Sequence, residues 1–300
     1  MQSAETICNP TGMLDLVFMQ NQPRISVIIA VFNAQTTLQQ CLDSVAQQSY
    51  KNMEVVVVDG GSSDDSVSIL QRNDSLIDYW TSEPDHGVYH AWNKALRQAN
   101  GDWICFLGAD DYLWNPDVLL TMMSRLRTLS PDTQIAYGQV MLLTASGDSM
   151  YPIGQSWADL GKQLKKWMCI PHPGAMHRRS FFDVYGDFDE TYSIAGDYEL
   201  FLRGISDGNA KAVFIPDLIT VGMRHGGLSS NPNNTLRVIK EMRRAQKKYG
   251  QRWADLIWLL AVIRICARSC LWGLLGEKAG KKGVDLARRL KGLPKYWSKV

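Results

Sequence analysis

The segment Ile25-Ser26-Val27-Ile28-Ile29-Ala30-Val31-Phe32-Asn33 decides the fold of this 300-residue chain. An uninterrupted run of β-branched and other apolar residues is typical of a strand that is buried on both faces of a parallel sheet. The next segment has apolar residues at helical spacing, with Asn33 as its expected N-cap, and residues 53–58 form a second apolar run that ends at Asp59. These segments predict a βαβ unit.

The alternation continues beyond this unit. It predicts a strand at 76–81, a helix at 88–99 and a strand at 103–107, which ends in Gly108-Ala109-Asp110-Asp111. Strands that alternate with helices build a doubly wound α/β layer, in which ligands bind outside the carboxyl ends of the strands. Because Asp59, Asp110 and Asp111 all follow such strand ends, we expect three carboxylates to converge on one crevice.

The order of elements becomes irregular after a helix predicted at 117–129. A hairpin is expected from 135–143 and 149–153, and glycine- and proline-containing loops follow up to Arg224. We therefore expect three parts in the chain. They are a loose polar arm at 1–22, one α/β domain at 23–232 and a helical tail at 233–300.

The ligand class follows from the motifs that occur and from those that do not. The chain has no Gly-x-Gly-x-x-Gly after its first strand and no P-loop Gly-Lys-Ser/Thr, which argues against dinucleotide oxidoreductases and P-loop NTPases. Adjacent carboxylates are hard oxygen ligands for Mg²⁺ or Mn²⁺ when substrate phosphates complete the coordination shell. Asp, Gly and Ser also form ordinary turns, so either loop alone favours a turn. Together, on neighbouring strands, they favour a metal-bridged diphosphate.

Four segments then carry a specific resemblance. Residues 26–33 match the pattern S-V-I-I-P-V-Y-N, with Ala30 for Pro and Phe32 for Tyr, and residues 57–64 match V-D-G-S-T-D. Residues 82–94 match S-E-x-D-x-G-I-Y-D-A-x-N-K, and Ala109-Asp110-Asp111 stands where a D-x-D or x-D-D metal motif is found. Over residues 24–228 the chain resembles the inverting, GT-A-fold enzymes of glycosyltransferase family 2, in a subgroup that builds bacterial surface polysaccharides.

The resemblance implies a site. Asp111 would bind a divalent cation, Mn²⁺ or Mg²⁺, and Asp59 would read the nucleobase of a nucleotide-sugar donor. His90 stands where the subgroup often has an acidic residue, so no role is assigned to it. The full set of residues expected to contact the donor is Ala30, Phe32, Asn33, Asp59, Asp85, Lys94 and Asp110.

An inverting transfer also needs a base that removes the proton of the acceptor hydroxyl. Asp197 matches the acidic base of the family, and Glu199 is the runner-up. A helix N-cap is an alternative role for Asp197, and both roles are compatible. His172 resembles the family's histidine near the acceptor, although a lone histidine is more often structural. His225, which precedes Gly226-Gly227, could approach the metal or simply lie on the surface.

The balance of charged residues differs between the first 232 residues and the rest of the chain. Residues 1–232 hold 15 Lys/Arg against 26 Asp/Glu, whereas residues 233–300 hold 17 against 4. The tail includes a long apolar segment at 254–275 that is interrupted by Arg264 and Arg268, which favours a helix lying on an anionic membrane surface over one that crosses it. Packing on the domain or in an oligomer is the alternative. Nucleic acid is disfavoured because the first half is acidic and lacks a recognisable binding module.

The sequence therefore predicts a GT-A-like mixed sheet with helices on both faces and a metal-dependent inverting glycosyltransferase of hexosyltransferase type. We expect it to transfer a sugar to a lipid-linked saccharide acceptor during surface polysaccharide or glycolipid synthesis. Six scattered cysteines without a C-x-x-C pair, and a start unlike a secretory signal, favour the cytoplasmic face of the cell membrane.

Two other functions stay open. One is a non-catalytic nucleotide-sugar-binding or scaffold subunit, which the intact Asp59, Asp111 and Asp197 disfavour. The other is a nucleotidyltransferase, which should carry a glycine-rich basic loop after the first strand, where this chain has Val31-Phe32-Asn33-Ala34.

Overall fold

The computed structural model describes residues 22–144, 146–156, 163–205, 210–229, 231, 234–250, 256–290 and 292. The arm expected at 1–22 lies outside them except for Gln22, as do parts of the tail at 233, 251–255, 291 and 293–300.

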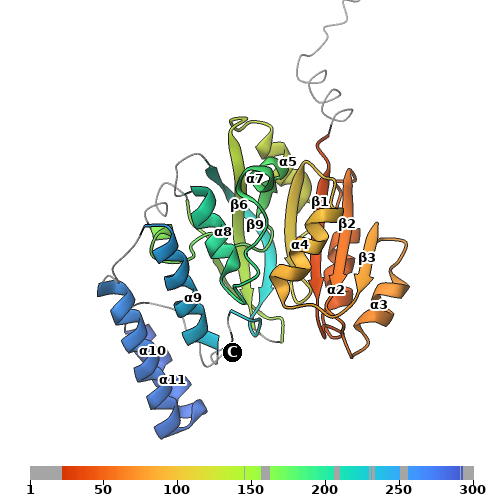
Figure 1. Ribbon diagram of the computed structural model, residues 1–300. Coiled ribbons are helices and arrows are strands. Elements are labelled where there is room, and N and C mark those ends of the chain that lie inside the picture. The colour runs from red at the N-terminus through yellow and green to blue at the C-terminus, as the bar shows by residue number, and fades with distance from the viewer. Residues whose placement is uncertain are drawn as a thin grey trace, which may run out of the picture.

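A single sheet forms the centre of the described chain (Figure 1). Its strand order is β3-β2-β1-β4-β8-β6-β9-β5, with β7 paired to β6. The first four strands are parallel, β8 is antiparallel to β4 and β6, and β6 is parallel to β9. The strands are β1 (Ile25–Val31), β2 (Met53–Asp59), β3 (Tyr79–Ser82), β4 (Trp103–Gly108), β5 (Tyr112–Leu113), β6 (Thr133–Leu143), β7 (Ser149–Ile153), β8 (Met176–Arg178) and β9 (Lys211–Arg224).

Helices cover both faces of this sheet, as the sequence predicts. Alternate residues of β1 divide between two cores: Val27 and Ile29 pack with α2, α3 and α5, whereas Ile28 packs with α4, α7 and α8. The helices are α2 (Leu38–Ala46), α3 (Ser66–Arg72), α4 (Val88–Gln98), α5 (Val118–Leu126), α7 (Arg179–Tyr185), α8 (Gly196–Ile205), α9 (Thr235–Lys248), α10 (Leu256–Leu275) and α11 (Glu277–Arg289).

Strand register brings the expected carboxylates to one edge. Ala30 on β1 lies between Val58 of β2 and Gly108 of β4, and Val31 is paired with Asp59. The loops that leave β1, β2 and β4 therefore start side by side at the carboxyl edge of the parallel strands.

Two local predictions were wrong in detail. The third strand begins at Tyr79 rather than at residue 76, because Leu76 and the next residue close hydrogen-bonded turns after α3. Asn33 does not cap a helix: it has a φ of 49° and accepts a hydrogen bond from the Ser63 N–H through its side chain. The helix begins at Leu38 instead, with Thr37 at its N-cap position.

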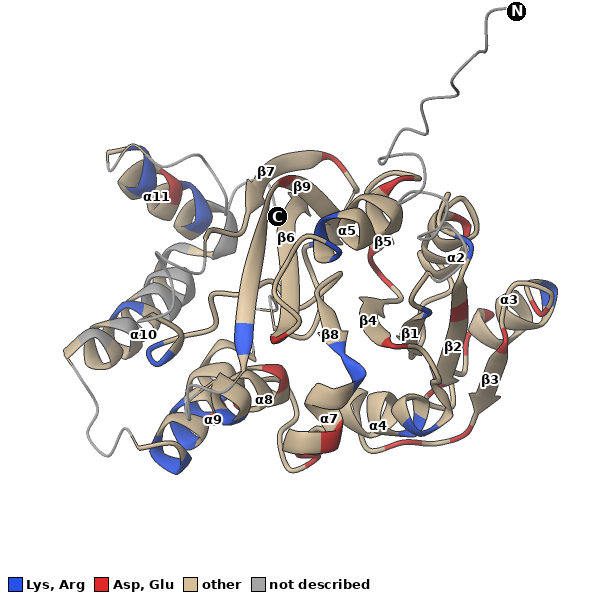
Figure 2. Cartoon of the chain, turned by 90° about the horizontal axis from the view of Figure 1, so that it is seen from above, with Lys and Arg blue, Asp and Glu red and all other residues tan. Residues whose placement is uncertain are grey.

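The C-terminal helices extend from one side of the domain. Helix α9 packs against α8, and α10 packs against α11 and, less extensively, against α9 (Figure 1). Helix α9 carries lysine and arginine residues, drawn in blue in Figure 2. Among the described residues, no helix has the length and apolarity needed to cross a membrane. The division of the chain at residue 232 stays a prediction.

Candidate active site

A pocket of about 210 Å³ lies at the carboxyl edge of the sheet. Aromatic side chains from α4 and β4 form part of its wall, and the carboxylates of Asp110, Asp111 and Asp197 line it together. Residues of the 223–229 segment complete the wall. The structure thus brings the predicted metal ligand and the predicted base, which are 86 positions apart in the sequence, into one pocket.

The carboxylates of Asp110, which is half-buried, and Asp111, which is buried, form a close pair. A Cβ atom added to Gly108 would lie 2.7 Å from Asp110 Oδ1 and 3.1 Å from Asp111 Oδ2, so both side chains fold back over this glycine. Burial raises the pKa of Asp111 well above its usual range, and the charge of Asp110 raises it further. Burial also raises the pKa of Asp110. Both shifts have the direction expected where two negative charges lie close together without a compensating cation.

This pair fits a divalent cation. The Arg224 backbone N–H donates to Asp111 Oδ1 at 3.0 Å and holds that carboxylate in place. Two adjacent hard oxygen ligands, completed by phosphate oxygens, are the usual protein contribution to a Mg²⁺ or Mn²⁺ site. Within the described parts of the chain, no cluster of three or more potential metal-ligating side chains occurs.

Asp197 lies in the first turn of α8. Its carboxylate accepts a hydrogen bond from the Tyr198 N–H at 2.8 Å and one from the Tyr89 hydroxyl at 3.3 Å. Burial raises the pKa of Asp197 to about 6. Because α8 begins at Gly196, Asp197 is not the N-cap residue that was weighed as an alternative. A carboxylate with a pKa near neutrality is suited to accept a proton from a hydroxyl.

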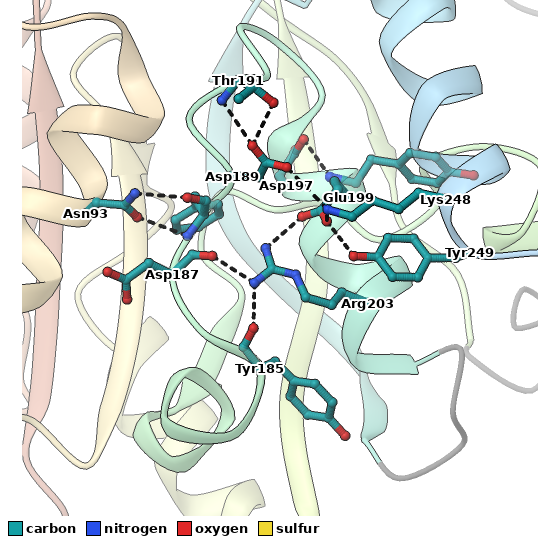
Figure 3. A network of polar contacts seen from close by, with 12 residues as sticks. Asn93, Tyr185, Asp187, Asp189, Thr191, Asp197, Glu199, Arg203, Lys248 and Tyr249 are labelled. Carbon is teal, nitrogen blue, oxygen red and sulfur yellow. Dashed lines mark hydrogen bonds and ion pairs between the residues drawn. The ribbon is translucent and has the colours of Figure 1, made fainter.

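Glu199 has the opposite environment (Figure 3). It is fully buried and accepts hydrogen bonds from Arg203 at 2.7 Å, Lys248 at 2.9 Å and the Tyr249 hydroxyl at 2.5 Å. Burial raises its pKa, but these three donors outweigh that effect, so the pKa is lowered. Glu199 does not line the pocket and is engaged in holding α8 to α9. The structure therefore favours Asp197 over the runner-up.

The loops after β2 and β3 pack against each other beside the pocket. Asp59 is buried, and its carboxylate accepts from the N–H groups of Gly61 and Ser62 and from the hydroxyls of Ser62 and Ser82. Three of these bonds fall on Oδ2, and Oδ1 accepts from the Ser62 hydroxyl. Asp59 thus fixes the loop, and its expected contact with a nucleobase stays a prediction.

Asp85 is the second carboxylate of these loops. It accepts a hydrogen bond from the Gly87 N–H at 2.8 Å, and its Oδ2 would lie 2.6 Å from a Cβ atom on Gly60. A side chain at position 60 would therefore displace Asp85. The absence of a side chain there gives Asp85 its place at the strand edge.

The other expected donor-binding residues are spread along this edge. Ala30 is half-buried near the end of β1, and Phe32 is 65% exposed just beyond it. Lys94 forms an ion pair with Glu83 at 2.8 Å, which ties α4 to the loop after β3. None of these three, nor Asn33, lines the pocket of Asp111.

The two histidines differ in setting. His172 is buried in the pocket wall against Trp92 and Phe106, and burial together with nearby His177 lowers its pKa well below the usual range. It is therefore a neutral side chain at the site. His225 is half-buried, and burial and the charge of Lys281 on α11 lower its pKa.

The residues of the pocket that the sequence did not indicate include Tyr89, Trp92 and Arg224. Tyr89 and Trp92 line it from the same face of α4, and their spacing of three residues on a helix next to a recognised motif was an available signal. Arg224 gave no such signal, because its contact with Asp111 joins residues 113 positions apart.

Comparison with known proteins identifies the family of the chain. A family model described as Glycosyl transferase family 2 matches residues 26–185, which carry the strand-end carboxylates. The chain belongs to glycosyltransferase family 2. A protein of Mycobacterium bovis (strain BCG / Pasteur 1173P2) named PGL/p-HBAD biosynthesis glycosyltransferase is 30% identical over 214 residues, which cover 69% of this chain and 80% of that relative.

Solved structures show that this family 2 chain has the GT-A fold. The mannosyltransferase PcManGT from Pyrobaculum calidifontis aligns with a TM-score of 0.58 at 18% identity, over 93% of this chain and 84% of that one. S. aureus TarS 1-349 aligns with the same TM-score and identity over 74% of this chain. The alignment covers 65% of TarS 1-349, which is slightly less than two thirds of its length. The protein is a glycosyltransferase with a mixed α/β sheet, as the sequence predicts.

Proposed function

We propose that this glycosyltransferase is a metal-dependent, inverting enzyme that uses a nucleotide-sugar donor. The observation that carries the proposal is the shared pocket of the Asp110–Asp111 pair and Asp197. Solved complexes of the structural neighbours support the donor class. The PcManGT structure contains GDP-Man and Mn²⁺, and TarS 1-349 was solved with UDP-GlcNAc.

The carboxylates divide the work of the transfer. Asp110 and Asp111 would hold the cation, and a divalent cation bound there supplies electrostatic stabilisation of the negative charge on the departing diphosphate. Asp197 accepts the proton of the acceptor hydroxyl while the hydroxyl oxygen attacks the anomeric carbon from the side opposite the diphosphate. One displacement of this kind inverts the anomeric configuration.

A second pocket supports the role of Asp197. This pocket, of about 600 Å³, is lined by β7, by residues 168–173 and by Asp197. Asp197 and His172 belong to the walls of both pockets, so a sugar in the first and an acceptor in the second would meet at Asp197. Its polar and apolar lining, which includes Gln139, Tyr151 and Gln155, suits a saccharide.

For the nucleobase, the loops favour Asp85 as the residue that makes direct contact. Asp59 already accepts four hydrogen bonds from its own chain, whereas Asp85 lies over Gly60 at the strand edge. In this proposal Asp59 shapes the loop and Asp85 contacts the base.

The C-terminal helices would bring the enzyme to a lipid-linked acceptor. Helix α10 exposes Leu256, Leu259, Leu260 and Ile263, whose i, i+3, i+4, i+7 spacing places them on one face. Helix α11 adds a set of exposed or half-exposed cations, Lys281, Lys282, Arg288 and Arg289. An apolar face with nearby cations fits an anionic membrane surface. We propose peripheral association with the cytoplasmic face of the membrane and a role in surface polysaccharide or glycolipid synthesis.

A panel of nucleotide sugars tests the catalytic proposal. With Mn²⁺ present, one donor should raise the melting temperature and undergo slow hydrolysis, and NMR should show a product of inverted anomeric configuration. Donor binding without any turnover, with every acceptor tried, would favour the scaffold alternative. In a parallel assay that supplies a nucleoside triphosphate and a sugar 1-phosphate, release of pyrophosphate would favour the nucleotidyltransferase.

A further inference from the structure

Helix α9 presents a carboxylate to the segment that leads into α8. Glu241 Oε2 accepts hydrogen bonds from the N–H groups of Ile194 and Ala195, both at 2.9 Å. Glu241 Oε1 accepts from the Ser193 N–H at 3.1 Å and from the Ser193 hydroxyl at 2.6 Å. One side chain thus satisfies three consecutive backbone donors, which would otherwise need solvent or another acceptor.

The same face of α9 holds this segment at two more points. Arg244 donates to the Thr191 hydroxyl at 3.1 Å and lies 3.6 Å above the ring of Tyr192. Lys248 bridges Asp189 and Glu199 (Figure 3). Glu241, Arg244 and Lys248 are spaced i, i+3, i+7, so they form one stripe along the helix. Helix α9 therefore clamps the whole segment from residue 189 to the start of α8.

This segment positions Asp197. The Ile194 carbonyl accepts a hydrogen bond from the Tyr89 hydroxyl at 2.6 Å, and the same hydroxyl reaches Asp197 Oδ1 at 3.3 Å. Ile194 and Asp197 both line the pocket of Asp111. A shift of residues 193–195 would consequently move both the base and the tyrosine that contacts it.

We infer that Glu241 is a positioning residue for Asp197: it fixes the entry of α8 and thereby the orientation of the base. The inference rests on the proposed function, because it needs Asp197 to be the base. Residue 241 lies beyond the 26–185 match that defines the family here. Glu241 does not itself line either pocket, and it contacts the wall of the first pocket through the backbone N–H of Ile194. Its effect should therefore fall on turnover and spare donor binding.

A double-mutant cycle in the full-length enzyme tests this. Glu241→Gln keeps the size of the side chain but replaces one acceptor oxygen by a donor, so it cannot satisfy all of Ser193, Ile194 and Ala195. We expect kcat for Mn²⁺-dependent donor hydrolysis to fall by up to about 100-fold, the loss associated with a small misplacement of a reacting group. The Kd for UDP or GDP with Mn²⁺ should be unchanged. Lys240→Gln, an exposed neighbour on the same helix, is the control for loss of one charge.

The effect of Glu241→Gln in an Asp197→Asn background shows whether Glu241 acts through Asp197 or through the stability of the whole protein. In an Asp197→Asn background, Glu241→Gln should cause almost no further loss of kcat, because the group that it positions is already gone. Equal losses in both backgrounds would overturn the inference, as would native kcat in the single variant. Native kcat for Asp197→Asn itself would instead overturn the proposed base. If Glu241→Gln unfolds, Ser193→Ala, which removes only the hydroxyl contact, should show a smaller loss with the same coupling.

Discussion

At the residue scale, two carboxylates two positions apart on α8 show how environment assigns roles. Asp197 lines the pocket and has a pKa raised to about 6 by burial, whereas Glu199 is saturated by Arg203, Lys248 and Tyr249. In the sequence the two residues look alike, because both are acidic and they are two positions apart. Only the partners that the fold supplies distinguish the proposed base from a carboxylate that is held in structural contacts.

The first prediction compares these two residues. Asp197→Asn should lower kcat by about 10² to 10⁴-fold and leave donor affinity unchanged, since the amide cannot accept the hydroxyl proton. Glu199→Gln should keep near-native kcat but lower the free energy of unfolding by about 2 kcal/mol, because it leaves Arg203 and Lys248 without their anion. Steady-state kinetics and urea unfolding of both variants give the comparison. The assignment is reversed if Glu199→Gln alone loses turnover.

The pH dependence of turnover gives a second prediction. With saturating Mn²⁺, kcat of the wild-type enzyme should fall as the pH drops through about 6, because Asp197 becomes protonated there and can no longer accept a proton. Above that pH the base is ionised and kcat should be level. The residual activity of Asp197→Asn should lack this acidic limb. A wild-type profile that is flat down to pH 4.5 would contradict the role of Asp197.

The third prediction is that a substitution of Asp111 stabilises the metal-free protein and abolishes its response to Mn²⁺. Asp111→Asn keeps the size and the acceptor for the Arg224 N–H but removes the charge of a buried carboxylate that lies beside the like charge of Asp110. The melting temperature of the metal-free protein should therefore rise, while the increase produced by Mn²⁺ and all transfer activity should vanish. Differential scanning fluorimetry with and without Mn²⁺ measures both effects. Asp132→Asn, an exposed surface carboxylate, should change neither.

At the element scale, residues that follow the strand ends form much of the candidate site. The sequence predicted the positions of these residues better than those of any other part of the site. A buried parallel strand is a local pattern, and its carboxyl edge follows from topology, so the places of Asp59, Asp110 and Asp111 at strand ends could be predicted. The expected convergence of all three on one crevice was wrong in part, because Asp59 does not line the pocket of Asp110 and Asp111. The clamp by α9 could not be predicted, because it joins residue 241 to residues 193–195, and a helix pattern does not show which face meets which loop. For the same reason Glu199 stayed a candidate base until its partners were known.

The loops after β2 and β3 yield a fourth prediction. Gly60→Ala would place a Cβ atom 2.6 Å from Asp85 Oδ2 and must displace that carboxylate. If Asp85 contacts the nucleobase, UDP or GDP should bind about ten-fold more weakly or worse, the cost of one hydrogen bond to a charged group. Pyrophosphate with Mn²⁺ should bind as it does to the wild type. Gly283→Ala on α11, where a Cβ atom meets nothing, is the matched control, and equal loss for pyrophosphate would argue against the base contact.

At the scale of the whole molecule, the charge division in the sequence has a partial structural counterpart. Arg244 and Lys248 of α9 form hydrogen bonds with residues of the acidic domain. Part of the basic tail therefore makes contacts inside the protein. The exposed apolar face of α10 and the cations of α11 lie beyond that clamp. A membrane-binding element should therefore be separable from the part of the tail that supports catalysis.

The last prediction tests that separation by deleting residues 253–300, which keeps α9 and its contacts. The full-length protein should bind vesicles that contain anionic lipid, and binding should weaken as salt rises, since exposed charges are screened beyond about 8 Å at physiological ionic strength. The deletion should abolish vesicle binding and transfer to a lipid-linked acceptor, but should preserve donor hydrolysis because Glu241 still holds the entry of α8. Sedimentation with vesicles and the two activity assays measure these effects. A truncated protein that aggregates or changes its oligomeric state would instead show that α10 and α11 cover the domain or a second copy.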